Sequence, residues 1–154
     1  MREILFRGKA IDGNWYYGVP LVFTEDYVCM TAPHTHNKKV EANTIGQFTG
    51  LTDKNGNKIF EGDIFKFPDE IFESYYTSCG TEYNSWEVEN YGIVGFSEDL
   101  GRFDFVDYKF NENAVDADLH ENHDIEFYDF VSDLEVIGNI HDNPELLKGD
   151  KSDA

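Results

Sequence analysis

Histidines and cysteines are the residues of this chain best suited to bind a metal ion, and four of the histidines stand in pairs. His34 and His36 would share a face only on a strand, whereas His120 and His123 would do so only on a helix. A zinc site needs three or four ligands with fixed geometry. The remaining candidate ligands are Cys29, Cys79 and His141. They could in principle complete such a site, but no spacing predicts it, so we interpret the paired histidines as exposed loop residues.

The acidic segment 116–124, "DADLHENHD", carries oxygen atoms of the kind that bind calcium, on Asp116, Asp118 and Glu121. An EF-hand loop requires glycine at its sixth position and glutamate at its twelfth. Counted from Asp116, these positions hold Glu121 and Phe127. The sequence therefore rejects an EF-hand and leaves only weak, nonspecific cation binding.

Catalytic motifs are absent from the sequence: it has no GxSxG, P-loop, GxGxxG or HExxH. Paired carboxylates can serve as acid and base in hydrolases when burial raises the pKa of one of them. With 31 Asp and Glu residues some pairs occur by chance, and the sequence does not say which are buried. We predict no catalytic, cofactor-binding or metal-binding residue and no cofactor, and we leave the ligand-binding residues unknown.

Negative charge is the strongest feature of the composition, with 31 acidic against 12 basic residues and a net charge of −19. The segment 97–154 alone has 17 acidic and 4 basic residues. A field of this sign repels phosphate backbones, which argues against direct binding of nucleic acid. It attracts cationic partners, although a solvated surface explains the same charge. An ordered array of these carboxylates would instead act as a DNA mimic that competes with DNA for a basic host protein.

A length of 154 residues fits one domain. The 13 Phe, 9 Tyr and 2 Trp exclude a wholly disordered chain and favour strands. The opening "MREILFRGKA" lacks the apolar run of a signal peptide, and no stretch is long and apolar enough to cross a membrane. We therefore expect a cytoplasmic protein of a bacterial cell, with Cys29 and Cys79 reduced and Cys29 the more buried of the two.

Alternating apolar residues and turn signals predict a chain of short strands with little helix. We expect strands at 2–9, 15–23, 27–32, 91–98, 101–110 and 134–140. Pro20 should interrupt its strand or place it at a sheet edge, since it lacks an amide hydrogen. Phe103, Phe105 and Tyr108 should supply apolar surface.

Other segments have weaker patterns. Residues 68–90 are interpreted as an excursion from the sheet with a short helix near 69–76, and 111–124 as a long exposed loop. The segment 125–133 fits either a helix or a strand. A helix should begin after Asn143 as N-cap, with Pro144 at its first position.

The stretch 47–65, "QFTGLTDKNGNKIFEGDIF", places Asn55-Gly56 between two strand-like runs. Asn-Gly is the strongest short hairpin signal, because a type I′ turn needs positive φ at both central residues. We predict a hairpin turn at Asn55 and Gly56, with positive φ at Gly56. Gly62 and Asp63 indicate a bulge or second turn. A structural role explains the whole stretch.

Three segments together resemble the YopX-like family of small phage and prophage proteins. They are "ILFRGKAIDGNWYYG", "IGQFTGLTDKNGNKIFEGDI" and "SDLEVIGNIHDNPELL". The resemblance implies a mainly β fold related to SH3-type barrels and a phage-derived origin, and it implies no activity. We predict a mainly β, SH3-like barrel or roll with extra strands and little helix. It would form a single domain over 1–147 with a frayed acidic tail at 148–154.

The function that we predict is a non-catalytic accessory protein that binds a host or phage protein. The alternative is a carboxylate- or metal-dependent hydrolase that uses acids of the C-terminal half. A third possibility is a structural or assembly component of the phage, or the acidic DNA mimic. Open strand edges on an aromatic-rich β domain also favour a homo-oligomer, which the negative charge opposes.

Overall fold

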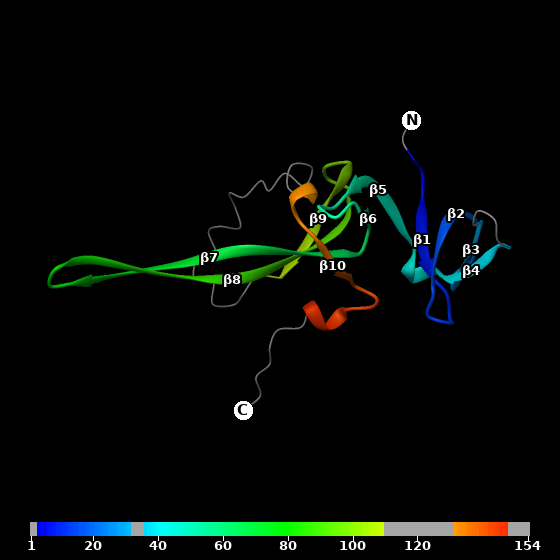
Figure 1. The fold of residues 1–154 in the computed structure, drawn as a ribbon. Coiled ribbons are helices and arrows are strands. Elements are labelled where there is room, and N and C mark those ends of the chain that lie inside the picture. The colour runs from blue at the N-terminus through cyan, green and yellow to red at the C-terminus, as the bar shows by residue number, and fades with distance from the viewer. Residues whose placement is uncertain (1–2, 32–35, 110–130, 148–154) are drawn as a thin grey trace, which may run out of the picture.

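Two open antiparallel sheets make up the computed structural model, which describes residues 3–31, 36–109 and 131–147 (Figure 1). One sheet has the strand order β4-β3-β2-β1-β5-β6 and the other β10-β7-β8-β9. The mainly β class with little helix is confirmed. Neither sheet closes into a barrel within these ranges, so the SH3-like barrel of the prediction is not confirmed.

The six-stranded sheet consists of β1 (Phe6–Lys9), β2 (Trp15–Phe23), β3 (Tyr27–Thr31), β4 (Lys38–Glu41), β5 (Gly46–Thr52) and β6 (Lys58–Phe60). The four-stranded sheet consists of β7 (Asp63–Thr77), β8 (Gly80–Ser97), β9 (Arg102–Lys109) and β10 (Val136–Asn139). Short 3-10 helices follow at η1 (Ala42–Thr44), η3 (Val131–Asp133) and η4 (Pro144–Leu147). Within the described residues the strands predicted from alternation all form, and the one predicted at 91–98 is the end of the longer β8.

The buried apolar residues form two clusters. In the six-stranded sheet, β3 alternates between buried and half-buried residues, and the buried cluster consists of Ala10, Val28, Met30 and Val40. Gly8 lies where a Cβ atom would come within 2.5 Å of the Val40 side chain. Only glycine lets β1 pack this closely against β4.

The four-stranded sheet buries larger, aromatic side chains. The cluster there consists of Phe65, Val94, Phe103 and Phe105 of this sheet, together with Ile59 of β6 and Val131 of η3. Phe65 and Phe105 meet edge to face with ring centroids 5.7 Å apart. The predicted apolar roles of Phe103 and Phe105 are confirmed, while the side chain of Tyr108 lies outside the described part. Burying one such aromatic side chain contributes roughly 1.5–3 kcal/mol.

Pro20 has the effect that its missing amide hydrogen predicts. Strand β2 pairs with β1 only as far as Gly18, so the segment 19–23 pairs with β3 alone. The register with β3 shifts between Pro20 and Val22, which marks a bulge. The proline therefore stands both at a locally open edge and beside an interruption of the ladder.

The hairpin between β5 and β6 forms where the sequence predicts it, with φ of +81° at Gly56. Its turn differs in detail. The N–H of Gly56 donates to the carbonyl of Asp53, and the N–H of Asp53 donates to the carbonyl of Asn57. The loop thus spans 54–56 and is one residue longer than a two-residue Asn-Gly turn. Gly62, with φ of +87°, forms the predicted second turn before β7.

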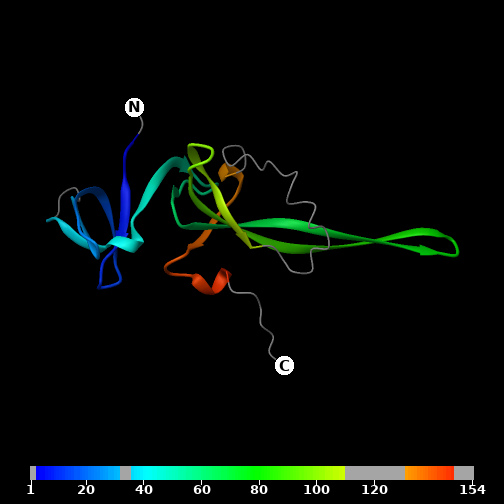
Figure 2. The same ribbon diagram turned by 180° about the vertical axis from the view of Figure 1, so that it is seen from behind.

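The predicted short helix near 69–76 is wrong. Residues 63–97 form one long hairpin in which Ile64–Thr77 pairs with Gly80–Ile93 without interruption. We call this ribbon the arm; its far part extends beyond β9 and β10 and projects away from the rest of the two sheets in both Figure 1 and Figure 2. The side chains at the far end of the arm are exposed on both faces, so no alternation of apolar and polar residues marks it as strand.

At the C-terminal end, the predicted helix is a single 3-10 turn that begins at Pro144. The side-chain oxygen of Asn143 accepts from the N–H of Asn139 instead of capping this turn. Both cysteines are free: Cys29 is half-buried in β3, and Cys79 is exposed in the turn between β7 and β8, as expected. Within the described ranges, no helix has the length and hydrophobicity to span a membrane.

Candidate functional site

The residues that the sequence offered as metal ligands do not come together in the described part of the chain. His34, His120, His123 and the acidic segment 111–124 lie outside it. Cys29 lies in the six-stranded sheet and Cys79 at the end of the arm, at opposite ends of the molecule (Figure 1). Among the residues described, no group of three or more His, Cys, Asp or Glu side chains is placed to hold a metal ion.

The three segments that carry the family resemblance meet between the two sheets. Arg7 of β1 lies there with its guanidinium 4.9 Å from the ring centroids of both Trp15 and Phe60. Its Nη2 forms an ion pair with Asp63 at 2.7 Å and donates to the carbonyl of Glu61. Arg7 and Asp63 are both buried. We call these residues, together with those of the next paragraph, the junction cluster.

Asp142, just after β10, forms the second half of the junction cluster. Its carboxylate accepts from Lys9 Nζ at 2.6 Å and from Trp15 Nε1 at 2.7 Å. The side-chain amide of Asn139 donates to the same carboxylate at 3.1 Å. The ring of His141 packs against Trp15 with centroids 6.0 Å apart. The first and last strands of the chain are thereby fixed to each other.

The electrostatics of the junction cluster follow from these contacts. The hydrogen bond from Lys9, followed by those from Trp15 and Asn139, lowers the pKa of Asp142 to about 2. Burial raises the pKa of Asp63 and outweighs the opposing effect of Arg7. Burial, with the nearby charge of Arg7, lowers the pKa of His141. The carboxylates of Asp63 and Asp142 each contact a cationic side chain and accept from further N–H groups. This arrangement is suited to joining the two sheets.

Asp53 is a second buried carboxylate with a structural role. It accepts from the N–H groups of Asn55 and Asn57 within the hairpin turn and from the N–H of Val136 in β10. Burial raises the pKa of Asp53, but these hydrogen bonds outweigh burial, so the pKa lies below its ordinary value. One carboxylate thus connects the β5–β6 turn to the last strand.

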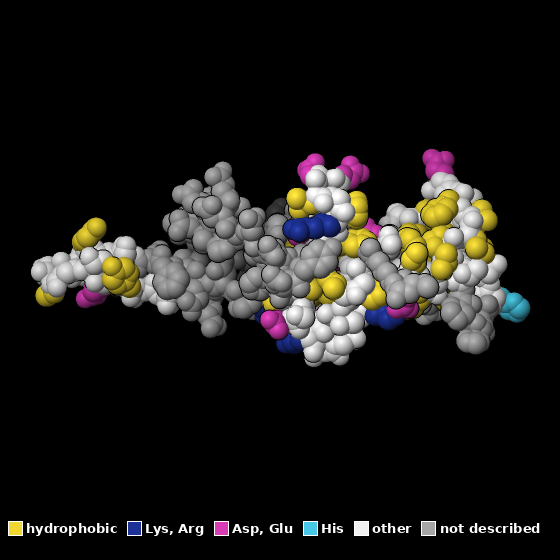
Figure 3. All heavy atoms as spheres, turned by 90° about the horizontal axis from the view of Figure 1, so that it is seen from above, with side chains coloured by type: hydrophobic (Ala, Val, Ile, Leu, Met, Phe, Trp, Pro, Cys, Tyr) yellow, Lys and Arg dark blue, Asp and Glu magenta, His cyan; other side chains and the backbone are white. Residues whose placement is uncertain are grey.

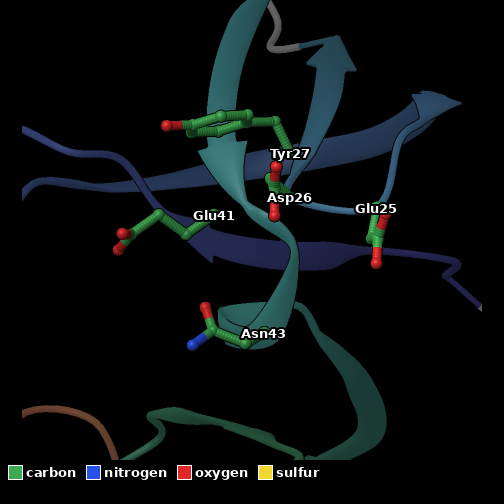
Figure 4. A pocket seen from close by; sticks show the side chains of 5 residues that line it. All are labelled: Glu25, Asp26, Tyr27, Glu41 and Asn43. Atoms are coloured by element: carbon green, nitrogen blue, oxygen red, sulfur yellow. The ribbon is translucent and has the colours of Figure 1, made fainter.

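A shallow pocket of about 340 Å³ lies beside β3 and β4, and Figure 4 shows its lining residues: Glu25, Asp26, Tyr27, Glu41 and Asn43. Glu25 and Glu41 lie on opposite sides of Asp26 and do not converge on one point (Figure 4). Lys39 Nζ already lies 3.9 Å from the centroid of the Tyr27 ring. The pocket therefore presents scattered acidic groups without a shared focus for a ligand.

Three acidic side chains of the C-terminal half are paired with cations among the residues described. Asp142 is paired with Lys9, Glu135 with Lys54 and Asp104 with Arg102. The acidic segment 111–124 lies outside the described residues. The DNA mimic therefore stays a prediction.

Exposed apolar side chains lie at both ends of the molecule and also near its middle, where Phe96, Leu100 and Val106 of the β8–β9 hairpin are exposed (Figure 3). At one end they come from the part of β2 that follows Gly18, namely Val19, Leu21, Val22 and Phe23. At the other end they come from the arm, where Tyr76 is 91% and Tyr83 73% exposed, with Tyr75 also exposed. Residues 74–85, which we call the arm tip, are all exposed except the half-buried Thr77.

Comparison with known proteins then identifies the family. The model of the YopX protein family matches residues 6–148, which is nearly the whole chain. The chain belongs to the YopX family. Among solved structures, it is similar to protein EF1440 from Enterococcus faecalis, with 22% identity and a TM-score of 0.48, over 96% of this chain and 100% of that chain. No curated protein matches the chain.

The YopX match spans both the junction cluster and the arm. Sequence reasoning missed the pairing of Arg7 with Asp63 and of Lys9 with Asp142, because ion pairs between distant residues leave no local pattern. It also missed the arm tip. The available signal for the arm was the Ser78-Cys79-Gly80 turn, with an aromatic residue on either side at Tyr76 and Tyr83.

Proposed function

We propose that this YopX chain is a non-catalytic accessory protein of a phage or prophage that binds another protein through its arm. The observation that carries the proposal is the arm tip, a two-stranded ribbon that projects from the sheets and exposes Tyr75, Tyr76 and Tyr83 (Figure 3). Membership of the YopX family fits an accessory role. The phage origin follows from the family resemblance.

The arm has two physical properties of a binding element. A two-stranded ribbon is only marginally stable in water unless a third strand or another surface packs on it. Tyrosines contribute large contact areas with little loss of side-chain entropy, and they are enriched at the centres of protein interfaces. Single exposed aromatics are ordinary on protein surfaces, but this projecting tip exposes three tyrosines within nine residues.

Site-specific photo-cross-linking in the bacterial cell tests the proposal. A photoreactive amino acid at Tyr76 should give a discrete cross-linked protein. The same group at Ile11, which is 82% exposed at the far end of the molecule, should not. Cross-linked partners would be identified by mass spectrometry. Equal yields at both positions would contradict a specific role of the arm.

A shortened arm gives an independent control. Glu73 and Asn84 are opposite each other in the β7–β8 register, so Asn-Gly between them can replace 74–83 with a short hairpin turn. The unlabelled full-length protein should compete with the cross-link formed from Tyr76, and the shortened protein should not. Competition by both proteins would place the binding surface elsewhere.

A further inference from the structure

The net charge of the chain is confined to its second part. Residues 1–62 have seven acidic and seven basic residues and no net charge, whereas residues 63–154 have 24 acidic and 5 basic residues and account for the whole net charge of −19. The first six strands therefore form a neutral half. The arm belongs to the strongly negative half.

The arm itself has no cationic residue along most of its length. Its segment 67–90 contains six acidic residues and neither lysine nor arginine. In the neutral half, by contrast, cations lie over aromatic rings: Lys38 over Tyr16 at 5.2 Å, Lys39 over Tyr27 at 3.9 Å and Lys58 over Phe48 at 5.0 Å from the ring centroids. The arm's own segment cannot supply a cation to the tyrosines of its tip.

The β7–β8 register determines on which face of the ribbon each tyrosine of the arm tip lies. Tyr76 is opposite Thr81 and Ser74 is opposite Tyr83, so Tyr76 and Tyr83 are diagonal neighbours on one face of the ribbon. Tyr75 is opposite Glu82, and both belong to the other face. One face thus presents two aromatic rings, and the other presents a ring beside a carboxylate.

We propose that the arm tip recognises arginine side chains on a basic protein surface. This inference rests on the proposed function, and it names the class of partner. A guanidinium stacks on aromatic faces and donates to a carboxylate in the same contact, which a lysine ammonium does less well. The Tyr76–Tyr83 face offers the stacking surface, and the Tyr75–Glu82 face offers stacking together with an acceptor.

Charge distinguishes this partner from a second copy of the chain. Two arms meeting tip to tip would bring Glu82 of each copy toward the other, within a protein of net charge −19. A cationic surface is attracted electrostatically to the arm throughout its approach, and this attraction increases the association rate. Nucleic acid is repelled by the same field.

Binding of defined peptides tests the inference directly. The probes are an arginine-rich and a lysine-rich peptide of equal length and charge, titrated against the full chain at low and moderate salt. The arginine-rich peptide should bind several-fold more tightly. Y76S/Y83S should reduce that affinity about five- to thirtyfold and reduce the preference, since two exposed cation–π contacts are lost, each worth about 0.5–1 kcal/mol, while the Tyr75–Glu82 face remains. Y76F/Y83F should retain the preference because the rings remain.

The matched control is F23S, which removes an exposed aromatic ring at the other end of the molecule and should leave binding unchanged. Equal affinity for the two peptides, or an effect of F23S equal to that of Y76S/Y83S, would overturn the inference. So would sedimentation showing self-association that Y76S/Y83S abolishes, because the partner would then be a second copy. A Tyr76 cross-link to a partner without a basic surface would overturn it too, yet leave the proposed function intact.

Discussion

Arg7 and Asp63 form a buried ion pair that joins the two sheets: Nη2 lies 2.7 Å from Oδ1, and the side chains are only 9% and 2% exposed. Arg7 belongs to the first strand and Asp63 to the beginning of the arm. The remaining oxygen of Asp63 accepts from the N–H of Phe60 at 2.8 Å. The pair therefore fixes the origin of the arm relative to the six-stranded sheet.

Replacing Arg7 by leucine should strongly destabilise the fold. The substitution leaves the Asp63 carboxylate buried without its cation, which typically costs about 3–5 kcal/mol. Urea denaturation followed by circular dichroism would measure the free energy of unfolding. In the exposed pair of Lys54 with Glu135, the side chains are 49% and 50% exposed, so K54A should cost less than about 1 kcal/mol. Similar losses for R7L and K54A would show that the buried pair is not what joins the sheets.

Acid should weaken the fold partly through Asp142. Its pKa is lowered from 3.8 to about 2 by Lys9 first and then by Trp15 and Asn139, so the folded state binds the proton less readily than the unfolded state. The resulting stability is fully present above about pH 4 and is lost as pH falls toward 2. Because the side chain is one-third exposed, we expect a contribution of only about 1 kcal/mol.

The D142N protein provides the measurement for this pH effect. Its free energy of unfolding should fall less between pH 4 and pH 2 than that of the unmodified protein. E98Q, which removes one negative charge at the exposed turn between β8 and β9, should retain the full pH dependence. If the stability of D142N fell with pH in parallel with that of the unmodified protein, the Lys9–Asp142 contact would not be the source of the pH dependence.

Removal of the Asp53 side chain should loosen both the hairpin turn and β10. D53A leaves the N–H groups of Asn57 and Val136 without their acceptor, and each lost part-buried hydrogen bond costs about 0.5–1.5 kcal/mol. Hydrogen exchange should show faster exchange at both N–H groups together. D12A removes a similar acceptor from the exposed turn at Asn14 and should have a much smaller effect. Faster exchange at Asn57 alone would argue against a connection to β10.

A β-branched residue at Gly56 should destabilise the hairpin through its backbone alone. Gly56 has φ of +81°, and a Cβ atom added there would meet no other atom within 4 Å, so the cost of G56V is conformational and on the order of 1 kcal/mol or more. G56N should cost less, because asparagine tolerates positive φ. G46A should instead act through a clash, since its Cβ would lie 2.7 Å from the carbonyl of Glu61. Thermal unfolding would measure the stability of the three proteins. G56V should be less stable than G56N, and G46A should also be less stable than the unmodified protein.

Local chemistry is what the sequence by itself determined. Alternation placed most strands, the Asn-Gly step placed the β5–β6 hairpin, and Pro20 marked the interruption of β2, because each depends on the conformational preference of a few consecutive residues. The aromatic content indicated a mainly β protein. The three segments of the family resemblance pointed to residues that turn out to meet at the junction.

Only the tertiary structure decided how distant residues combine. The pairing of Arg7 with Asp63 spans 56 positions in the chain and that of Lys9 with Asp142 spans 133, so no local periodicity encodes either. The prediction of a helical excursion fails for the arm because its tip is exposed on both faces, and a ribbon without a buried face shows no period of two. The arm is held together by hydrogen bonds between β7 and β8. These bonds depend on two segments meeting, so neither segment alone encodes them.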